Sequence, residues 1–258
     1  MLSQFMFNCS TNLLRALIIV LILSNTSCNR YYDLQDALRN PEEVKKLKLS
    51  NGSFVTLPPE IGTLTELKKL NLFNNNLTSL PAEIGELKNL ERLILSRNNL
   101  KTLPKEIGDL TNLRRLSLSF NKLDSLPSEI GNLDSLEVLK LDYNRLTKLP
   151  PEIGNLDNLG MLYLENNRLQ SLPPEIGKLQ NLTFLYIGKN DLEKLPSEIG
   201  NIEGLIELKL THAGAVLTLP NSVCRLRYLE YLYISNDALL PGCIMVKQDH
   251  KFHLIVEP

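Results

Sequence analysis

Residues 90–112 read LERLILSRNNLKTLPKEIGDLTN, and the same arrangement of leucine, asparagine, proline and glycine returns every 23 residues. Within this stretch Leu93 and Leu95 are two residues apart, which is the spacing of side chains that share one face of a β-strand. A unit this short cannot bury its apolar side alone, but stacked units bury it against one another. The stretch therefore predicts one coil of a repeat solenoid.

The first apolar residue of the unit keeps its phase along most of the chain. Steps of 23 residues from Val44 reach Leu67, Leu90, Leu113, Leu136, Leu159, Leu182 and Leu205. Seven units span 44–204 without a gap, and the eighth, 205–228, is one residue longer. A partial ninth unit follows and ends at Leu240. We therefore expect eight full repeats and a partial ninth over 44–240.

Polar and turn residues recur at fixed points of the unit. An asparagine follows each strand position, at Asn75, Asn98, Asn121, Asn144, Asn167 and Asn190. Its amide can bond backbone groups of a turn and of the next coil, which predicts a buried ladder with every polar group satisfied. A proline followed by x-Glu-Ile-Gly predicts a short helical turn, with a left-handed backbone at the glycine. Gly52 and Ala213 replace the asparagine near the two ends, where repeats are commonly atypical.

Together these positions form the pattern L-x-x-L-x-L-x-x-N-x-L-x-x-L-P-x-x-I-G-x-L, which resembles that of leucine-rich repeat proteins. The 23-residue LPxEIGxL form is similar to bacterial leucine-rich repeat proteins common in spirochaetes, of the exported or lipoprotein type. It also resembles Ras-binding-type repeats of plants and animals. The resemblance implies an α/β, right-handed solenoid shaped like a horseshoe. A parallel sheet would line its concave side and short helical or 3-10 turns its convex side, and its role would be protein recognition.

The first 27 residues have the order of a secretory signal peptide. Arg15 is their only charged residue, an apolar run covers residues 16–23, and small polar residues precede Cys28. The apolar run would reach about 12 Å as a helix, which is too short to cross a bilayer core of about 30 Å. This segment is either a lipoprotein signal or one of two plain alternatives, a signal peptide without acylation or a buried N-terminal apolar segment.

Cys28 stands where bacterial lipoprotein signals place the cysteine that is acylated, and the segment resembles a lipobox at Ser27 and Cys28. It departs from the usual pattern at Asn25, where an apolar residue is common. We expect 1–27 to be a signal peptide and an acylated Cys28 to anchor an exported protein at the outer membrane or cell surface. A periplasmic, secreted or cytoplasmic location is the alternative.

Each end of a stacked core needs a cover. Residues 28–43 predict a linker and a capping helix over 33–39, with Asp33 as its N-cap. Residues 241–258 predict a C-terminal cap, in which Phe252, Leu254 and Val256 alternate as in a final strand.

Two cysteines lie near the C-terminal end of the repeats, Cys224 in the last full coil and Cys243 in the cap. In an exported chain an even pair predicts a disulfide that fastens the cap to the repeats. Two buried thiols are the alternative in a chain that stays in the cytosol.

The strand residues on either side of the inward leucine should line the concave face. The third position of successive units reads Lys46, Lys69, Arg92, Arg115, Val138, Met161, Phe184, Glu207 and Tyr231. The fifth reads Lys48, Asn71, Ile94, Ser117, Lys140, Tyr163, Tyr186, Lys209 and Tyr233. Neighbouring strands lie about 4.8 Å apart, so each series forms a continuous column. We call Lys46, Lys69, Arg92 and Arg115 the basic column.

Aromatic and methionine side chains gather on the later coils of these columns. The predicted contacts are Met161, Tyr163, Phe184, Tyr186, Tyr231 and Tyr233, with Phe73, Phe120 and Tyr143 at strand edges. Exposed aromatic side chains are enriched at interface hot spots. We therefore expect a protein partner on these residues, with the basic column steering an acidic partner or holding its rim. The plain alternatives are the β-propensity of aromatic residues and solvated surface charge.

Other function classes find little in the sequence. The net charge is −1, which implies no general attraction to nucleic acid. No phosphate-binding loop, nucleophile elbow or zinc motif is present, and the repeated glutamates form a column rather than a converging pair. Two histidines, His250 and His253, with Asp249 are too few ligands for a metal site. We expect no catalytic residue, cofactor or metal. A structural protein of the envelope and an intracellular signalling adaptor are the alternative roles.

Overall fold

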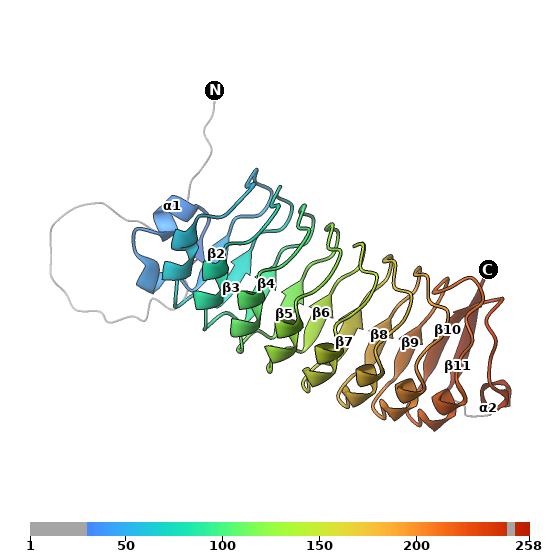
Figure 1. Cartoon of the computed structure of the whole chain (residues 1–258). Coiled ribbons are helices and arrows are strands. Elements are labelled where there is room, and N and C mark those ends of the chain that lie inside the picture. The colour runs from blue at the N-terminus through green and yellow to red at the C-terminus, as the bar shows by residue number, and fades with distance from the viewer. Residues whose placement is uncertain (1–29, 247–250) are drawn as a thin grey trace, which may run out of the picture.

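The computed structural model describes residues 30–246 and 251–258, and its strands form one parallel sheet that runs the length of the molecule (Figure 1). The predicted signal peptide and Cys28 lie outside the described residues. The described strands, in chain order, are β1 (Arg30–Tyr31), β2 (Lys46–Lys48), β3 (Lys69–Asn71), β4 (Arg92–Ile94), β5 (Arg115–Ser117), β6 (Val138–Lys140), β7 (Met161–Tyr163), β8 (Phe184–Tyr186), β9 (Glu207–Lys209), β10 (Tyr231–Ser235) and β11 (His253–Glu257). Each strand pairs with the next in sequence, so the chain advances by one coil per strand.

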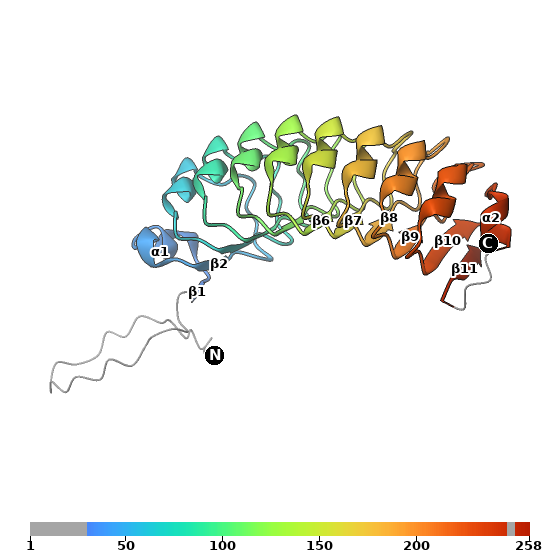
Figure 2. The same ribbon diagram turned by 90° about the horizontal axis from the view of Figure 1, so that it is seen from below.

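Short 3-10 turns lie opposite the strands, and the solenoid bends so that the strands follow its inner, concave side (Figure 2). The turns are η1 (Pro41–Glu43), η2 (Pro59–Thr63), η3 (Ala82–Glu86), η4 (Lys105–Asp109), η5 (Ser128–Asn132), η6 (Pro151–Asn155), η7 (Pro174–Lys178), η8 (Ser197–Asn201) and η9 (Asn221–Arg225). A proline with φ near the value its ring imposes precedes most of them, as Pro127 does at −68°. The predicted architecture of parallel strands and short turns is therefore confirmed.

The residues that recur every 23 positions are the residues that fill the core. Val44 and the leucines that follow it at 23-residue steps are completely buried until Leu205, and so are Leu93 and Leu95 of the quoted unit. A single apolar core therefore runs from one end of the solenoid to the other. Its continuity explains why no coil is expected to fold without its neighbours.

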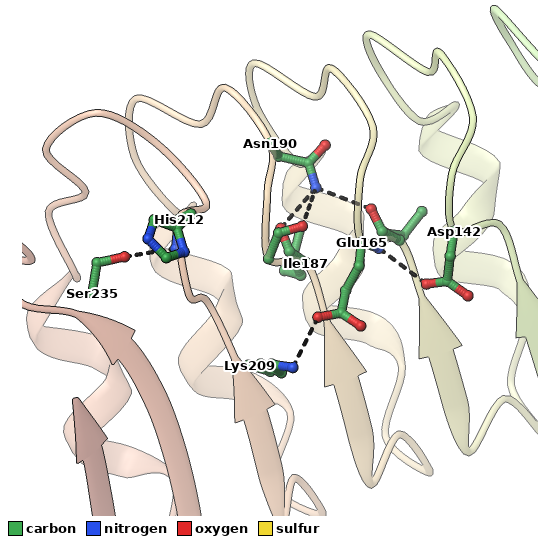
Figure 3. A network of polar contacts seen from close by, with 9 residues as sticks. Asp142, Glu165, Ile187, Asn190, Lys209, His212 and Ser235 are labelled. Carbon is green, nitrogen blue, oxygen red and sulfur yellow. Dashed lines mark hydrogen bonds and ion pairs between the residues drawn. The ribbon is translucent and has the colours of Figure 1, made fainter. Parts of the chain in front are cut away.

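The predicted asparagine ladder forms, as Figure 3 shows at Asn190, but each amide bonds to the coil before it rather than to the next one. The Asn190 Nδ2 donates to the carbonyl oxygens of Ile187 at 2.7 Å and Leu164 at 3.0 Å, and its Oδ1 accepts from the Leu169 N–H at 2.9 Å. The same three contacts recur around the other five asparagines, with small shifts at the first. Each amide therefore ties its own turn to the coil before it.

The eighth coil keeps this connection without an asparagine. At Ala213 the backbone carbonyl accepts from the Leu192 N–H at 2.6 Å, in the place where an asparagine Oδ1 stands in the other coils. This substitution requires a different backbone path, and the eighth unit is the one with an additional residue. The main chain thus compensates for the loss of the ladder asparagine at Ala213.

The expectation of a left-handed backbone at the turn glycines is wrong. No glycine among the described residues has a positive φ. A Cβ added to Gly131 would lie 2.4 Å from the Glu152 carbonyl oxygen of the next coil, so glycine is required for close stacking of the turns. Left-handed φ values occur instead one residue before the asparagine position, at Asn51, Asn74, Arg97, Phe120, Tyr143, Asn166, Lys189 and His212.

Each end of the repeat array carries terminal elements of its own. Helix α1 (Leu34–Ala37) corresponds to the helix predicted over 33–39, and the Asp33 carboxylate accepts from the Asp36 N–H as the N-cap. At the other end, α2 (Gly242–Met245) follows the repeats and β11 pairs with β10. Helix α2 and the pairing of β1 with β2 were not anticipated. Within the described ranges, no helix has both the length and the hydrophobicity needed to span a membrane.

Cys224 and Cys243 form a disulfide that joins η9 to α2, with their Cα atoms 5.9 Å apart. Because the bridge closes a loop between residues 19 positions apart, replacing both cysteines by serine should lower the free energy of unfolding by about 3 kcal/mol. Urea unfolding followed by circular dichroism would measure this loss. Reduced wild-type protein should lose the same amount. A double variant as stable as the oxidised wild type would contradict the stabilising role given to the bridge.

Candidate functional site

The concave face carries the two predicted columns in the predicted register. In the register of the sheet, Lys46 of β2 lies beside Lys69 of β3. The third-position column continues in this way from strand to strand, as far as Tyr231 and His253. In each strand from β2 to β9 the central leucine is buried, and neither of its two flanking residues is. The columns therefore point away from the core and are available for contact.

The basic column has no ion-pair partner among the described residues. In the row beside it, formed by the second residue of each unit, Lys68 pairs with Glu91 at 2.9 Å and Arg114 pairs with Glu137. The hydrogen bond from Lys68 lowers the pKa of Glu91, and nearby cations lower it further. The neighbouring row thus largely neutralises itself, and the basic column keeps its positive charge. A hollow of about 250 Å³ separates parts of the two rows, lined by Lys69, Glu91, Arg92, Arg114, Arg115 and Glu137.

Four of the predicted contact residues form one cluster on β7 and β8. We call Met161, Tyr163, Phe184 and Tyr186 the aromatic cluster. The rings of Tyr163 and Tyr186 lie 5.0 Å apart at 52°, and those of Phe184 and Tyr186 lie 6.5 Å apart at 42°. The Tyr163 hydroxyl donates to the Met161 sulfur at 3.7 Å. All four side chains remain partly exposed, so they form a continuous apolar surface with polar hydroxyls.

The tyrosines of the cluster stay neutral over the physiological range. Burial raises the pKa of Tyr186, and a hydrogen bond with the Glu207 carboxylate raises it further. Burial also raises the pKa of Tyr163, with a smaller contribution from Asp142. Both phenols therefore remain protonated and combine an apolar ring with a hydrogen-bonding group, as interface tyrosines commonly do.

The eighth coil separates the last two predicted tyrosines from this cluster. Strand β9 places Glu207 and Lys209 between them, and Lys209 pairs with Glu165 at 3.2 Å (Figure 3). Burial alone would lower the pKa of Lys209, but the hydrogen bond to Glu165 raises it overall. Beyond this pair, Tyr233 lies near the Lys209 ammonium and Tyr231 stacks on His253 at 5.1 Å.

Phe120 and Tyr143 lie apart from the aromatic cluster, at the edge where the strands end. Their rings stack 4.2 Å apart at 9°, and the Arg97 guanidinium lies 5.4 Å from the Phe120 ring and 5.8 Å from that of Phe73. We call Phe73, Arg97, Phe120 and Tyr143 the edge ladder. Sequence reasoning missed Arg97, although it stands 23 residues before Phe120 and so at the same position of its unit.

Two aromatic residues of the edge ladder have an unfavourable backbone conformation. Phe120 and Tyr143 have φ values of 59° and 55°, a region that bulky side chains rarely occupy and asparagine tolerates better. Both are nevertheless 44–45% exposed. Their stacking therefore offsets a backbone cost without filling the core.

Lys140 and Glu207 also contribute to the site without having been predicted as contacts. The Lys140 ammonium lies 4.7 Å from the centre of the Tyr163 ring, which is within cation–π range. Both residues occupy the predicted columns, so their position was available from the sequence, but their contacts were not. In the part of the chain that the structure covers, no group of three metal-binding side chains comes together.

Comparison with known proteins agrees with this architecture. The family model of the leucine-rich repeat region matches residues 3–144 and 128–213. No significant match was found among curated proteins. A solved structure of a leucine-rich repeat protein from Leptospira interrogans is similar to the chain at 33% identity and a TM-score of 0.62, covering 88% of this chain and 76% of that one.

Two longer proteins share the fold. The leucine-rich repeat ectodomain of the Arabidopsis thaliana membrane receptor kinase GASSHO1/SCHENGEN3, solved in complex with CASPARIAN STRIP INTEGRITY FACTOR 2, is 31% identical with a TM-score of 0.73. The match covers 88% of this chain and 28% of that one. The functional domain of InlJ from Listeria monocytogenes is 22% identical with a TM-score of 0.71, and the match covers 86% of this chain and 45% of that one. This last likeness concerns the fold alone.

Proposed function

The chain belongs to the leucine-rich repeat family, and from that premise we propose that it is a non-enzymatic module that recognises a protein partner with its concave face. Leucine-rich repeat domains commonly mediate protein–protein binding, and the Arabidopsis ectodomain was solved in complex with CASPARIAN STRIP INTEGRITY FACTOR 2. The single observation that carries the proposal is the aromatic cluster, which lies exposed on the sheet where the core does not need it.

The aromatic cluster supplies the chemistry of an interface centre. Aromatic side chains have large contact areas and lose little conformational entropy when they are immobilised, which is why they dominate hot spots. The hydroxyls of Tyr163 and Tyr186 stay protonated and can bond polar groups of the partner. We therefore assign the centre of the contact to this cluster, with Tyr231, Tyr233 and the edge ladder around it.

The basic column extends this surface toward the N-terminal coils. Its charge is not neutralised by neighbouring ion pairs, so it would attract an acidic surface before contact. We propose that the partner carries acidic residues that face these coils while its apolar residues cover the aromatic cluster.

Reversing two charges of the basic column should slow binding rather than loosen the bound complex. For Arg92→Glu with Arg115→Glu, we expect the association rate at low salt to fall at least tenfold, on the order of the steering effects of clustered charge. The dissociation rate should change little, and the salt dependence of association should weaken. Lys105→Glu with Lys178→Glu, in η4 and η7 on the convex side, is the matched control. Equal association rates for the two double variants would contradict the steering role.

We also propose that the protein is exported and held at the outer membrane or cell surface by an acylated Cys28. The signal-like order of residues 1–27 supports this location. The disulfide between Cys224 and Cys243 supports it too, because such bonds persist in oxidising compartments. Metabolic labelling with a fatty acid tests the anchor, with Cys28→Ala as control, and protease treatment of intact cells tests surface exposure.

The outcomes separate the alternative roles. Label that depends on Cys28, together with protease sensitivity, agrees with a surface receptor or ligand. Label without sensitivity favours a structural role inside the envelope. A full-length, unlabelled protein in the cytosol favours an intracellular adaptor and contradicts the proposal of export.

Capture of a partner tests the function itself. The wild type, the concave variant Tyr163→Ala/Phe184→Ala/Tyr186→Ala and the convex variant Lys105→Ala/Ser128→Ala/Lys178→Ala would be immobilised in parallel. The proposed partner is a protein that the wild type and the convex variant retain and the concave variant loses. Capture of the same proteins by all three would contradict the assignment of the concave face.

A further inference from the structure

The parallel sheet ends at β11, and no described strand covers the outer edge of this strand. Five residues of β11 pair with β10, whereas the strands from β2 to β9 pair over three. An uncovered edge of this length presents unpaired backbone groups on which another strand can form.

The outward backbone groups can be identified from one hydrogen bond. The His253 N–H donates to the Glu230 carbonyl oxygen at 2.6 Å and therefore faces β10. Backbone groups alternate between the two sides of a strand. The N–H and C=O groups of Leu254 and Val256 consequently face away from the molecule.

The side chains at this edge also leave the core open. Leu254 pairs with Leu232 and Val256 pairs with Ile234, so both continue the two inward columns. Ile234 is 3% exposed, but Val256 is 53% exposed because no coil among the described residues covers it. Val256 therefore adds an exposed apolar side chain to the free backbone edge.

We propose that β11 pairs with β11 of a second copy of this chain, in an antiparallel register centred on Ile255. Leu254 of each copy then lies opposite Val256 of the other, and these two residues are the ones whose backbone groups face outward. Ile255 meets its own counterpart on the twofold axis as a non-hydrogen-bonded pair. The two sheets join into one, and the open ends of the two cores cover each other.

This edge fits a copy of itself better than an arbitrary strand. In the proposed register His253 of each copy faces Glu257 of the other, so an imidazole donor meets a carboxylate at both ends of the pairing. On the core side, apolar residues face apolar residues. A single register thus satisfies both faces of the strand, as a twofold interface requires. The dimer would present two concave faces to the partners of the proposed function.

Cysteine cross-linking tests the register directly in the full-length protein. A non-hydrogen-bonded antiparallel pair brings Cα atoms to about 4.5 Å, which is within disulfide range. Ile255→Cys should therefore form a covalent dimer under mild oxidation, and Val216→Cys, at an exposed position in the eighth coil and outside β11, should not. Equal cross-linking of the two variants would overturn the proposal, as would a monomeric wild type at micromolar concentrations in analytical ultracentrifugation.

A charge exchange provides a second test. His253→Glu places like charges opposite each other twice and should weaken dimerisation by roughly tenfold, given the usual cost of like-charged cross-strand pairs. Adding Glu257→Lys should restore it, because opposite charges then face each other again. Thermal unfolding would verify that each variant remains folded. Unchanged dimerisation in His253→Glu, or no recovery in the double variant, would show that the edges do not pair in this register.

Discussion

Replacing Asn121 by leucine is expected to lower the free energy of unfolding by about 2–4 kcal/mol, although the side chain stays similar in size. Asn121 is 8% exposed and satisfies three buried backbone groups: its Oδ1 accepts from the Leu100 N–H, and its Nδ2 donates to the carbonyls of Leu95 and Leu118. Leucine would leave the Leu100 N–H without a partner away from water, at a cost of about 1–3 kcal/mol. The carbonyls of Leu95 and Leu118 would each keep one hydrogen bond, from Asn98 and Asn144, so each lost bond there adds only about 0.5 kcal/mol.

The same measurement has a control in a second asparagine, nine residues before Asn121. Asn112 is exposed and makes a single side-chain bond, to the Lys88 carbonyl at 2.9 Å. Asn112→Ala should therefore cost less than about 1 kcal/mol. Urea unfolding followed by circular dichroism would compare the two variants. Similar losses for both would mean that the ladder does not contribute the stability assigned to it.

The sequence determines the fold here because one period controls both the core and its connections. Leu93, Leu95 and Asn98 stand at fixed points of a unit that repeats without a gap over 44–204. A wrong alignment of one coil would therefore misplace the leucines and asparagines of all the others. The same period placed every strand residue on a known side of the sheet. The two columns of the concave face were therefore predictable residue by residue.

Contacts between side chains on that face were not predictable in the same way. Glu207 bonds with Tyr186, and Lys209 pairs with Glu165, so the eighth coil divides the predicted aromatic set. These contacts depend on the rotamers of long side chains, which the repeat period does not specify. The prediction of a left-handed backbone at the turn glycines failed for a related reason. A glycine needed for close approach, such as Gly131, looks the same in sequence as one needed for a left-handed φ.

Replacing the three aromatic residues of the aromatic cluster is the second change with a large expected effect. In the Tyr163→Ala/Phe184→Ala/Tyr186→Ala variant, we expect binding of the captured partner to weaken by more than 100-fold, because hot-spot aromatics each contribute about 2 kcal/mol or more. Stability should suffer less than binding, since all three side chains are partly exposed and the buried leucines beneath them remain. The far-UV circular dichroism spectrum should stay that of the wild type.

The dissociation constant of the captured protein, measured side by side for wild type, the concave variant and the convex variant, tests the concave face most directly. We predict that the convex variant binds as the wild type does, while the concave variant loses at least two orders of magnitude in affinity and keeps its fold. Equal affinity of a folded concave variant would show that the partner binds elsewhere on the solenoid.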